Sequence, residues 1–129
     1  MRLGTTARRF LVGLLACCAA LAGQAADVPL DPNRVALFAD LHATTDKNNP
    51  HQRAGLATCI RDVLALNPRP ANVLFYGDLS FNHGDTNDYR LLKELVKPLE
   101  DGGIRWSACF GNHDRREPFF AVFPGRRPD

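Results

Sequence analysis

Three short polar blocks carry the residues of this sequence that could do chemistry. They are Asp40-Leu41-His42, Gly77-Asp78 and Gly111-Asn112-His113-Asp114. Carboxylates that are drawn together in one cleft need a positive counter-charge, and a divalent metal ion is the natural one. Imidazoles, carboxylates and amide oxygens are all donors to such ions. The blocks therefore predict a metal centre, provided that the fold brings them together.

Each block alone has a more ordinary interpretation. An aspartate that follows a strand is more often a helix cap or a turn former, and Gly-Asn is most often a turn. The metal prediction therefore depends on the elements that position the blocks.

Short apolar runs precede all three blocks. Residues 35–39 and 72–76 predict buried strands, the first of them buried on both faces, and residues 104–110 predict a third strand. Residues 27–34, which contain two prolines, predict an extended lead-in.

Apolar residues recur at helical spacing between these strands. The first predicted helix ends at Asn67-Pro68, and its apolar positions are Ala54, Cys59, Ile60, Val63, Leu64 and Leu66. The second is expected to start from Thr86 or Asn87 as its N-cap and to end near Gly102-Gly103, with Pro98 kinking it or ending it early. Because strands and helices alternate, the sequence predicts an α/β fold with a mainly parallel sheet in the order strand, helix, strand, helix, strand.

Ligand sites of such sheets lie beyond the carboxyl ends of the strands, where the three blocks fall. If Asp40-x-His42 is extended, its two side chains point to the same face and give one ion two ligands. Asp78 could bridge two ions about 3.5 to 4 Å apart, and Gly77 would let the chain turn so that this carboxylate enters the site. Asn112 offers an amide oxygen to the second ion.

The three blocks, in this order, resemble the D-x-H, G-D and G-N-H-[D/E] motifs of the calcineurin-like metallophosphoesterases. The resemblance covers about residues 35–123. A closer likeness to bacterial class III cyclic-nucleotide phosphodiesterases depends on Gly77-Asp78-Leu79 with Gly84, Tyr89, Leu99 after Pro98, and Arg116.

The resemblance implies a hydrolase of small-molecule phosphate esters that uses a water activated by two divalent ions of the Fe, Mn or Zn type. By resemblance, Asp40, His42 and Asp78 are ligands of the first ion, and Asp78 and Asn112 are ligands of the second. His113 resembles the histidine that contacts the phosphoryl group and helps the leaving oxygen depart, with Asp114 orienting its ring.

The family pattern continues with a lone His and a G-H-x-H motif, and neither follows Asp114 in this sequence. We therefore expect residues 26–129 to be a C-terminally truncated domain, the N-terminal half of the family's α/β/β/α sandwich. In such a half, the apolar tail at residues 119–123 is expected to have nothing to pack against. The alternative is a non-catalytic remnant that binds metal or phosphate.

Two further histidines are not assigned to the site. His83 is expected to be a solvent-exposed loop residue, because loops are surface segments by default, and His51 has no indication of function. A dinucleotide-binding fold is disfavoured, since no G-x-G-x-x-G motif follows the first predicted strand.

Residues 1–25 predict a secretory signal peptide and thus export to the periplasm or the medium. Three arginines precede the apolar run of residues 10–22, and the small-residue site Gly23-Gln24-Ala25 follows it. A transmembrane anchor is the alternative, but the run is shorter than the roughly 20 residues that span a bilayer.

Removal of this segment changes the charge balance and the number of cysteines. The whole chain has 16 Lys and Arg against 14 Asp and Glu, so loss of the three arginines leaves a net charge of −1 and no nucleic-acid footprint. Cys59 and Cys109 would remain, either as a disulfide or as two small buried apolar residues. The 129 residues suit a single domain, and nothing in the sequence predicts the oligomeric state.

Overall fold

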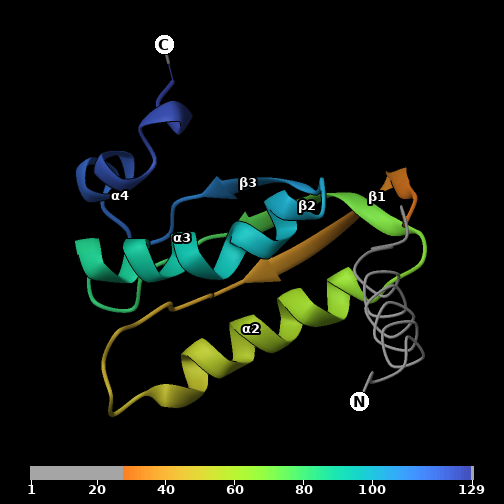
Figure 1. The fold of residues 1–129 in the computed structure, drawn as a ribbon. Coiled ribbons are helices and arrows are strands. Elements are labelled where there is room, and N and C mark those ends of the chain that lie inside the picture. The colour runs from red at the N-terminus through yellow and green to blue at the C-terminus, as the bar shows by residue number, and fades with distance from the viewer. Residues whose placement is uncertain (1–27, 129) are drawn as a thin grey trace, which may run out of the picture.

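The computed structural model describes residues 28–128, which alternate strands and helices (Figure 1). The elements in order are β1 (Leu30–Ala39), α2 (Pro50–Leu64), β2 (Arg69–Tyr76), α3 (Thr86–Asp101), β3 (Arg105–Cys109), α4 (Arg116–Val122) and the short 3₁₀ helix η1 (Pro124–Arg126). The predicted α/β class and the alternation of three strands with two helices are confirmed. The predicted signal peptide at residues 1–25 lies outside the described residues.

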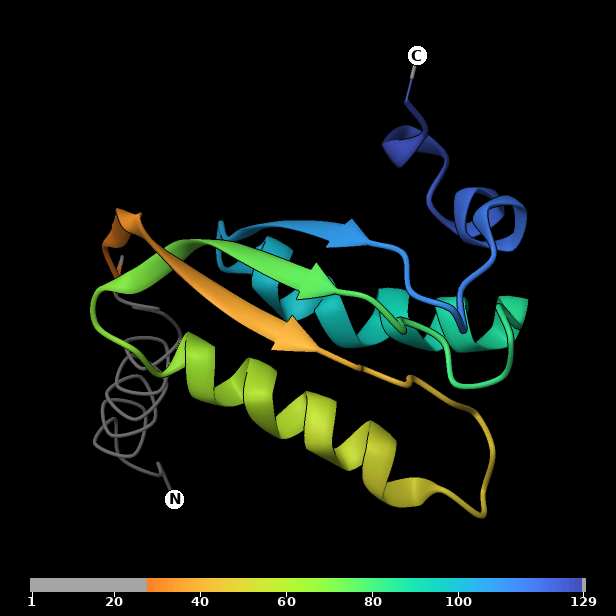
Figure 2. The same ribbon diagram turned by 180° about the vertical axis from the view of Figure 1, so that it is seen from behind.

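The three strands form one parallel sheet in the order β1-β2-β3. All three arrows point the same way in Figure 2, so the carboxyl ends of the strands share one edge of the sheet. β2 is the central strand, and the segment that contains Asp78 therefore leaves the sheet between the other two.

The helices cover one face of the sheet. Strand pairing aligns Ala36 with Val73 and Trp106 in one row, and Phe38 with Phe75 in the next. These residues belong to the core together with apolar side chains of α2 and α3. In Figure 1, α3 lies in front of β2 and β3, and in Figure 2 it lies behind them, while α2 runs below β1 in both views.

The other face is uncovered in the described part of the chain, and the prediction that the first strand is buried on both faces is wrong. Val35 and Leu37 of β1 are 54% and 68% exposed, and Tyr76 of β2 is 66% exposed. An apolar run shows that a strand can be buried, but the number of covered faces depends on which layers pack on it. β1 also begins earlier than predicted, at Leu30, with an irregular register between Asp31 and Val35.

α2 turns a narrower face to the core than the sequence pattern indicated. Leu56, Ile60 and Val63 are its buried residues, with spacings of four and three that form one stripe. Cys59 is exposed because it lies about 100° around the helix from Ile60. Cys59 and Cys109 are both free and both exposed, so neither the disulfide nor the buried pair is found.

α3 begins and ends close to where the sequence predicted, at Thr86 and Asp101. Asp85, one residue before the predicted caps, is the N-cap, and its side chain accepts a hydrogen bond from Asn87 N. The helix continues past Pro98 to Asp101. Proline lacks one N–H, and the last turn keeps its other partners, since Gly102 N donates to Pro98 O over 3.0 Å.

α4 and η1 overturn the prediction that residues 119–123 have nothing to pack against. Phe119 is buried edge-on against Tyr89, with ring centroids 5.5 Å apart, and Phe123 is buried against Trp106 at 5.4 Å. Apolar side chains of this segment therefore complete the core beside α3 and β3. The apolar sequence of residues 119–123 indicated that these side chains must be buried, but it did not indicate which surface they pack against.

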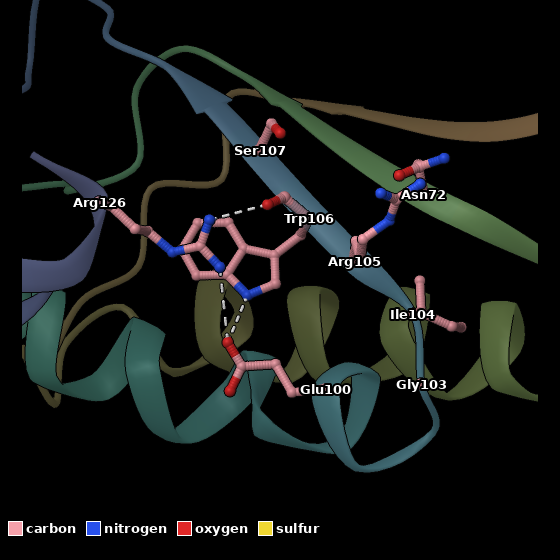
Figure 3. Close-up of a pocket in the computed structure, with 8 residues that line it drawn as sticks. All are labelled: Asn72, Glu100, Gly103, Ile104, Arg105, Trp106, Ser107 and Arg126. Carbon is pink, nitrogen blue, oxygen red and sulfur yellow. Dashed lines mark hydrogen bonds and ion pairs between the residues drawn. The ribbon is translucent and has the colours of Figure 1, made fainter. Parts of the chain in front are cut away.

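η1 is fastened to the core by a three-residue contact (Figure 3). The guanidinium of Arg126 lies 3.2 Å from the centre of the Trp106 ring and donates to Trp106 O over 2.8 Å. Glu100 accepts from Trp106 Nε1 over 2.8 Å and lies 3.6 Å from Arg126 Nη2. These residues line an open pocket of about 500 Å³ that also includes Gly103 and Arg105. This pocket lies toward the amino end of β3, away from the edge that carries the polar blocks.

Candidate metal centre

The three polar blocks meet at the carboxyl edge of the sheet, with Asp78 between the other two. His42 N donates to Asp78 O over 2.8 Å, which ties the loop after β1 to the loop after β2. His113 N donates to the Asp78 carboxylate over 3.1 Å, which ties in the loop after β3. Asp78 therefore connects all three blocks through its own oxygens.

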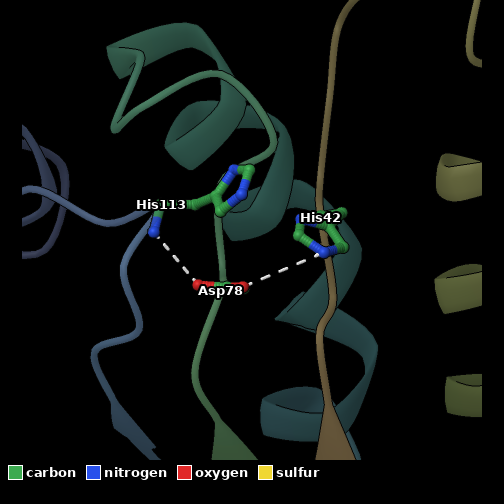
Figure 4. Close-up of side chains that lie close together, drawn as sticks. All are labelled: His42, Asp78 and His113. Carbon is green, nitrogen blue, oxygen red and sulfur yellow. Dashed lines mark hydrogen bonds and ion pairs between the residues drawn. The ribbon is translucent and has the colours of Figure 1, made fainter.

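His42, Asp78 and His113 form a cluster of metal donors (Figure 4). One donor atom from each of them lies within 4.8 Å of the other two. His42 Nε2 is 4.0 Å from Asp78 Oδ2, and the His42 and His113 rings meet edge to face with centroids 4.9 Å apart. Two imidazoles and a carboxylate are a donor set that Zn, Fe and Mn accept. His113, which the sequence suggested as a catalytic residue, thus also lies among the possible ligands.

Asp40 and Asn112 lie on another side of Asp78. With Asp78 they line an open pocket of about 390 Å³, and both are exposed. The argument from an extended Asp-x-His is wrong, because β1 ends at Ala39 and both residues have left-handed backbone, with φ of 52° at Asp40 and 44° at His42. The structure therefore places His42 with His113, while Asp40 shares a pocket with Asn112.

Left-handed backbone is concentrated at this edge. The non-glycine residues with positive φ in residues 28–128 are Asp40, His42, Asp78 and His83. Such conformations are uncommon for residues with a Cβ, cost of order 1–3 kcal/mol each and are found often at functional sites. Three of these four residues were predicted metal ligands or belong to the donor cluster.

Gly111 leaves room for the Asp78 carboxylate. A Cβ at Gly111 would fall on Asp78 Oδ1 and lie 2.5 Å from Asp78 N. The first residue of the Gly111 block is therefore part of the site, because it lets the loop after β3 pass directly against Asp78.

Asp114 does not orient the ring of His113, contrary to the expectation from the sequence. This carboxylate is buried and directed toward the loop after β2. It accepts hydrogen bonds from Leu79 N and Ser80 N at 3.1 Å, Gly111 N at 2.8 Å and the Tyr89 hydroxyl at 3.0 Å. The role of Asp114 in the structure is to hold two of the site's loops together.

The ring of His113 is held by a backbone carbonyl instead. Its Nδ1 lies 2.8 Å from Phe81 O. A carbonyl oxygen can only accept, so Nδ1 carries the hydrogen, and Nε2 of the neutral ring has a free lone pair.

Two buried polar residues beneath the site, Asp88 and Tyr89, were given no role in the site from the sequence, although Tyr89 is one of the residues that resemble class III phosphodiesterases. Asp88 is fully buried and accepts from Thr45 N, Ser80 Oγ and Asn82 N over 3.0 Å each. Tyr89 is also fully buried, and this burial raises the pKa of its hydroxyl above the ordinary value, an effect that the backbone N–H of Arg115 opposes. Asp88 resembles an ordinary residue of a helix first turn, so no feature of the sequence indicated its role.

The residues present fit a metal ion. His42 Nε2 and Asp78 Oδ2 face each other at 4.0 Å, which is too long for a hydrogen bond between them. The Gly111 cradle and the mixed nitrogen and oxygen donors around Asp78 agree with this reading.

Two comparisons with known proteins bear on the site. A family model described as calcineurin-like phosphoesterase matches residues 33–128, which include all three blocks. The probable glycerophosphodiester phosphodiesterase GpdQ of Arcobacter nitrofigilis is 39% identical over 62 residues, which are 48% of this chain and 21% of that protein. The matched part thus spans about a fifth of the length of this relative.

Proposed function

Because the chain belongs to the calcineurin-like phosphoesterase family, we propose that it works as a binuclear metal-dependent hydrolase of phosphate esters. The observation that carries the proposal is the meeting of His42, Asp78 and His113 at one edge of the sheet. The proposed ions are two divalent cations of the Fe, Mn or Zn type.

The proposed ligands are those that the family resemblance implies, and they lie on two sides of Asp78. His42, Asp78 and Asp40 would hold the first ion, and Asp78 and Asn112, which line one pocket with Asp40, would hold the second. When bound, such ions supply a water of lowered pKa and neutralise charge on phosphoryl oxygens. If a single ion were bound, His42, Asp78 and His113 would be the residues to hold it.

In the binuclear site, His113 would contact the phosphoryl group and the leaving oxygen. Its Nδ1–H is engaged with Phe81 O, so Nε2 is the nitrogen left for the substrate. As an imidazolium it could give a proton to the departing oxygen. Asp114 would act indirectly, by holding together the loops that carry Asp78 and His113.

The proposed substrate is a small phosphodiester. The similarity to a probable glycerophosphodiester phosphodiesterase supports this class, and the likeness to class III phosphodiesterases makes cyclic nucleotides one candidate within it. In residues 28–128, no helix has both the length and the apolar character that a membrane span requires. We also propose that residues 1–25 direct export of the chain.

The test is hydrolysis of bis(p-nitrophenyl) phosphate by the purified chain with Mn²⁺. Turnover in the parent that is lost in Asp78→Asn but kept in Asp101→Asn would support the proposal, because Asp101 lies at the far end of α3. Turnover that is unchanged in Asp78→Asn would contradict the role given to this carboxylate.

A competing proposal is a chain that binds metal or phosphate without turnover. The donor cluster supports the metal-binding part of this proposal as well, since three residues of the described chain converge there. Calorimetric binding of Mn²⁺ that depends on Asp78, in a chain without activity, would support this second function over the first.

A further inference from the structure

The turn at residues 81–84 makes two contacts with the ring of His113. Phe81 O accepts from Nδ1 of this ring over 2.8 Å. His83 lies flat on the same ring, with centroids 5.5 Å apart and only 10° between the planes. One short segment therefore fixes both an edge and a face of His113.

The turn is itself fixed to the rest of the fold on both sides. Phe81 N donates to Ala43 O over 3.0 Å. A Cβ at Gly84 would lie 2.5 Å from Arg115 Cβ and 2.8 Å from Arg115 N, so the turn sits directly against the chain that follows His113. Because the turn is anchored, the His83 ring is presented to His113 from a defined position.

The backbone of His83 is unfavourable for a histidine. Its φ is +48°, and the next residue, Gly84, has a φ of +79°. Glycine adopts this region without the steric penalty that a Cβ brings, so the local turn would favour glycine at position 83 as well. Strained backbone of this kind is found often at functional sites, so the conformation of His83 points to a role for its imidazole ring.

We propose that His83 is a positioning residue for His113, an inference that rests on the proposed function of the site. The stacked His83 ring and the Phe81 carbonyl hold the His113 imidazole in one orientation, so that its Nε2 stays available to the phosphate ester. His83 itself touches neither substrate nor metal in this proposal.

The variants His83→Gly and His83→Phe separate this role from a purely structural one. Glycine suits the left-handed backbone but removes the ring, and phenylalanine keeps a flat ring without the nitrogens. His51→Ala is the matched control, since His51 is an exposed histidine on α2.

The first measurement is the NMR signal of the His113 Nδ1–H in the metal-free chain. We expect this signal to be protected from exchange in the parent, in His83→Phe and in His51→Ala, and to broaden or vanish in His83→Gly. The thermal unfolding midpoint of His83→Gly should not fall, because glycine relieves the backbone.

The second measurement is turnover of bis(p-nitrophenyl) phosphate with Mn²⁺. We expect kcat to fall about tenfold in His83→Gly with little change in KM, and to recover in His83→Phe, as is typical when a residue that orients a functional group is lost. An unchanged Nδ1–H signal in His83→Gly would overturn the proposal, as would a loss that phenylalanine does not restore.

Failure of the proposed function has a different signature. If the parent shows no turnover while the Nδ1–H signal still depends on the ring at position 83, the phosphoesterase proposal fails and the positioning of His113 stands. If turnover is present and the signal does not depend on His83, the positioning role alone fails.

Discussion

Asp78 is the residue on which the geometry of the site converges, through its backbone oxygen to His42 and its carboxylate to His113. In Asp78→Asn the amide oxygen can still accept a hydrogen bond, but the negative charge that attracts a cation is gone. We expect Mn²⁺ affinity, measured by calorimetry, to fall by at least about tenfold, since loss of even outer-shell partners has effects of this size. Asp101→Asn should bind as the parent does, and equal affinity in the two variants would contradict the assignment.

Tyr89 links site and stability, because its buried hydroxyl donates to Asp114 and accepts from Arg115 N over 2.9 Å. Tyr89→Phe leaves the Arg115 N–H without this acceptor and removes one of the donors to the buried Asp114 carboxylate, which keeps Leu79 N, Ser80 N and Gly111 N. We expect the free energy of unfolding at neutral pH to fall by about 1–3 kcal/mol. Urea denaturation measures this change, and Tyr76→Phe, on the exposed face, is the control.

The same residue predicts a dependence of stability on alkaline pH. The folded state raises the pKa of Tyr89 chiefly through burial, so the neutral hydroxyl stabilises the fold fully at pH values below its ordinary pKa of about 10. As the pH rises above that value, the unfolded state ionises first and this stabilisation is lost. The difference in unfolding free energy between the parent and Tyr89→Phe should therefore shrink above about pH 10, and a difference that stays constant would contradict this account.

At the scale of elements, the loop after β3 must pass against the loop after β2, and Gly111 makes this approach possible. In Gly111→Ala the added methyl would collide with the Asp78 carboxylate, so one of the two loops must move. We expect Mn²⁺ binding to weaken by about tenfold or more, with a smaller effect on the thermal midpoint than on binding. Parent-like affinity in Gly111→Ala would show that the loops adjust without disturbing Asp78.

Gly55 in α2 offers the matched control for this substitution. A Cβ at Gly55 meets nothing within 4 Å, and alanine favours a helix interior over glycine by about 0.5–1 kcal/mol. Gly55→Ala should therefore raise the free energy of unfolding by about that amount and leave metal binding unchanged. A destabilised Gly55→Ala variant would mean that α2 tolerates less change than its exposed surface indicates.

The sequence predicted elements and the meeting of the blocks better than it predicted side-chain partners. The apolar runs located β2 and β3 closely, because strand periodicity is local information. The partners of Asp114 in the loop after β2 could not be predicted in this way, since Leu79 and Ser80 lie 35 and 34 residues away in the sequence and meet Asp114 only in the fold. The same holds for His42, whose left-handed backbone turns it away from the face that an extended strand would give.

At the scale of the whole molecule, the three strands with their helices are consistent with the N-terminal half of the α/β/β/α sandwich. Burial of Phe119 against Tyr89 shows that α4 completes the core on the helical face. The sequence did not predict that α4 packs there, because an apolar segment carries no information about the surface against which it packs.

The uncovered sheet face predicts how the chain behaves in solution. Val35 and Leu37 are both more than half exposed on this face and lie two residues apart on β1, so their side chains are neighbours. Contiguous apolar surface of this kind binds apolar probes, and we expect the folded chain to enhance the fluorescence of an anilinonaphthalene sulfonate dye.

Leu37→Lys should reduce this fluorescence without lowering the thermal midpoint, because substitutions of exposed residues usually change stability by no more than about 0.5 kcal/mol. Leu66→Lys is the matched control, since Leu66 is 45% exposed but lies beyond the end of α2 and outside the sheet. If Leu66→Lys reduced the fluorescence as much as Leu37→Lys, the dye would be reporting general apolar exposure. A loss confined to Leu37→Lys would assign the binding surface to the open face of the sheet, because that face is where the side chain of Leu37 lies in register with Leu74 of β2.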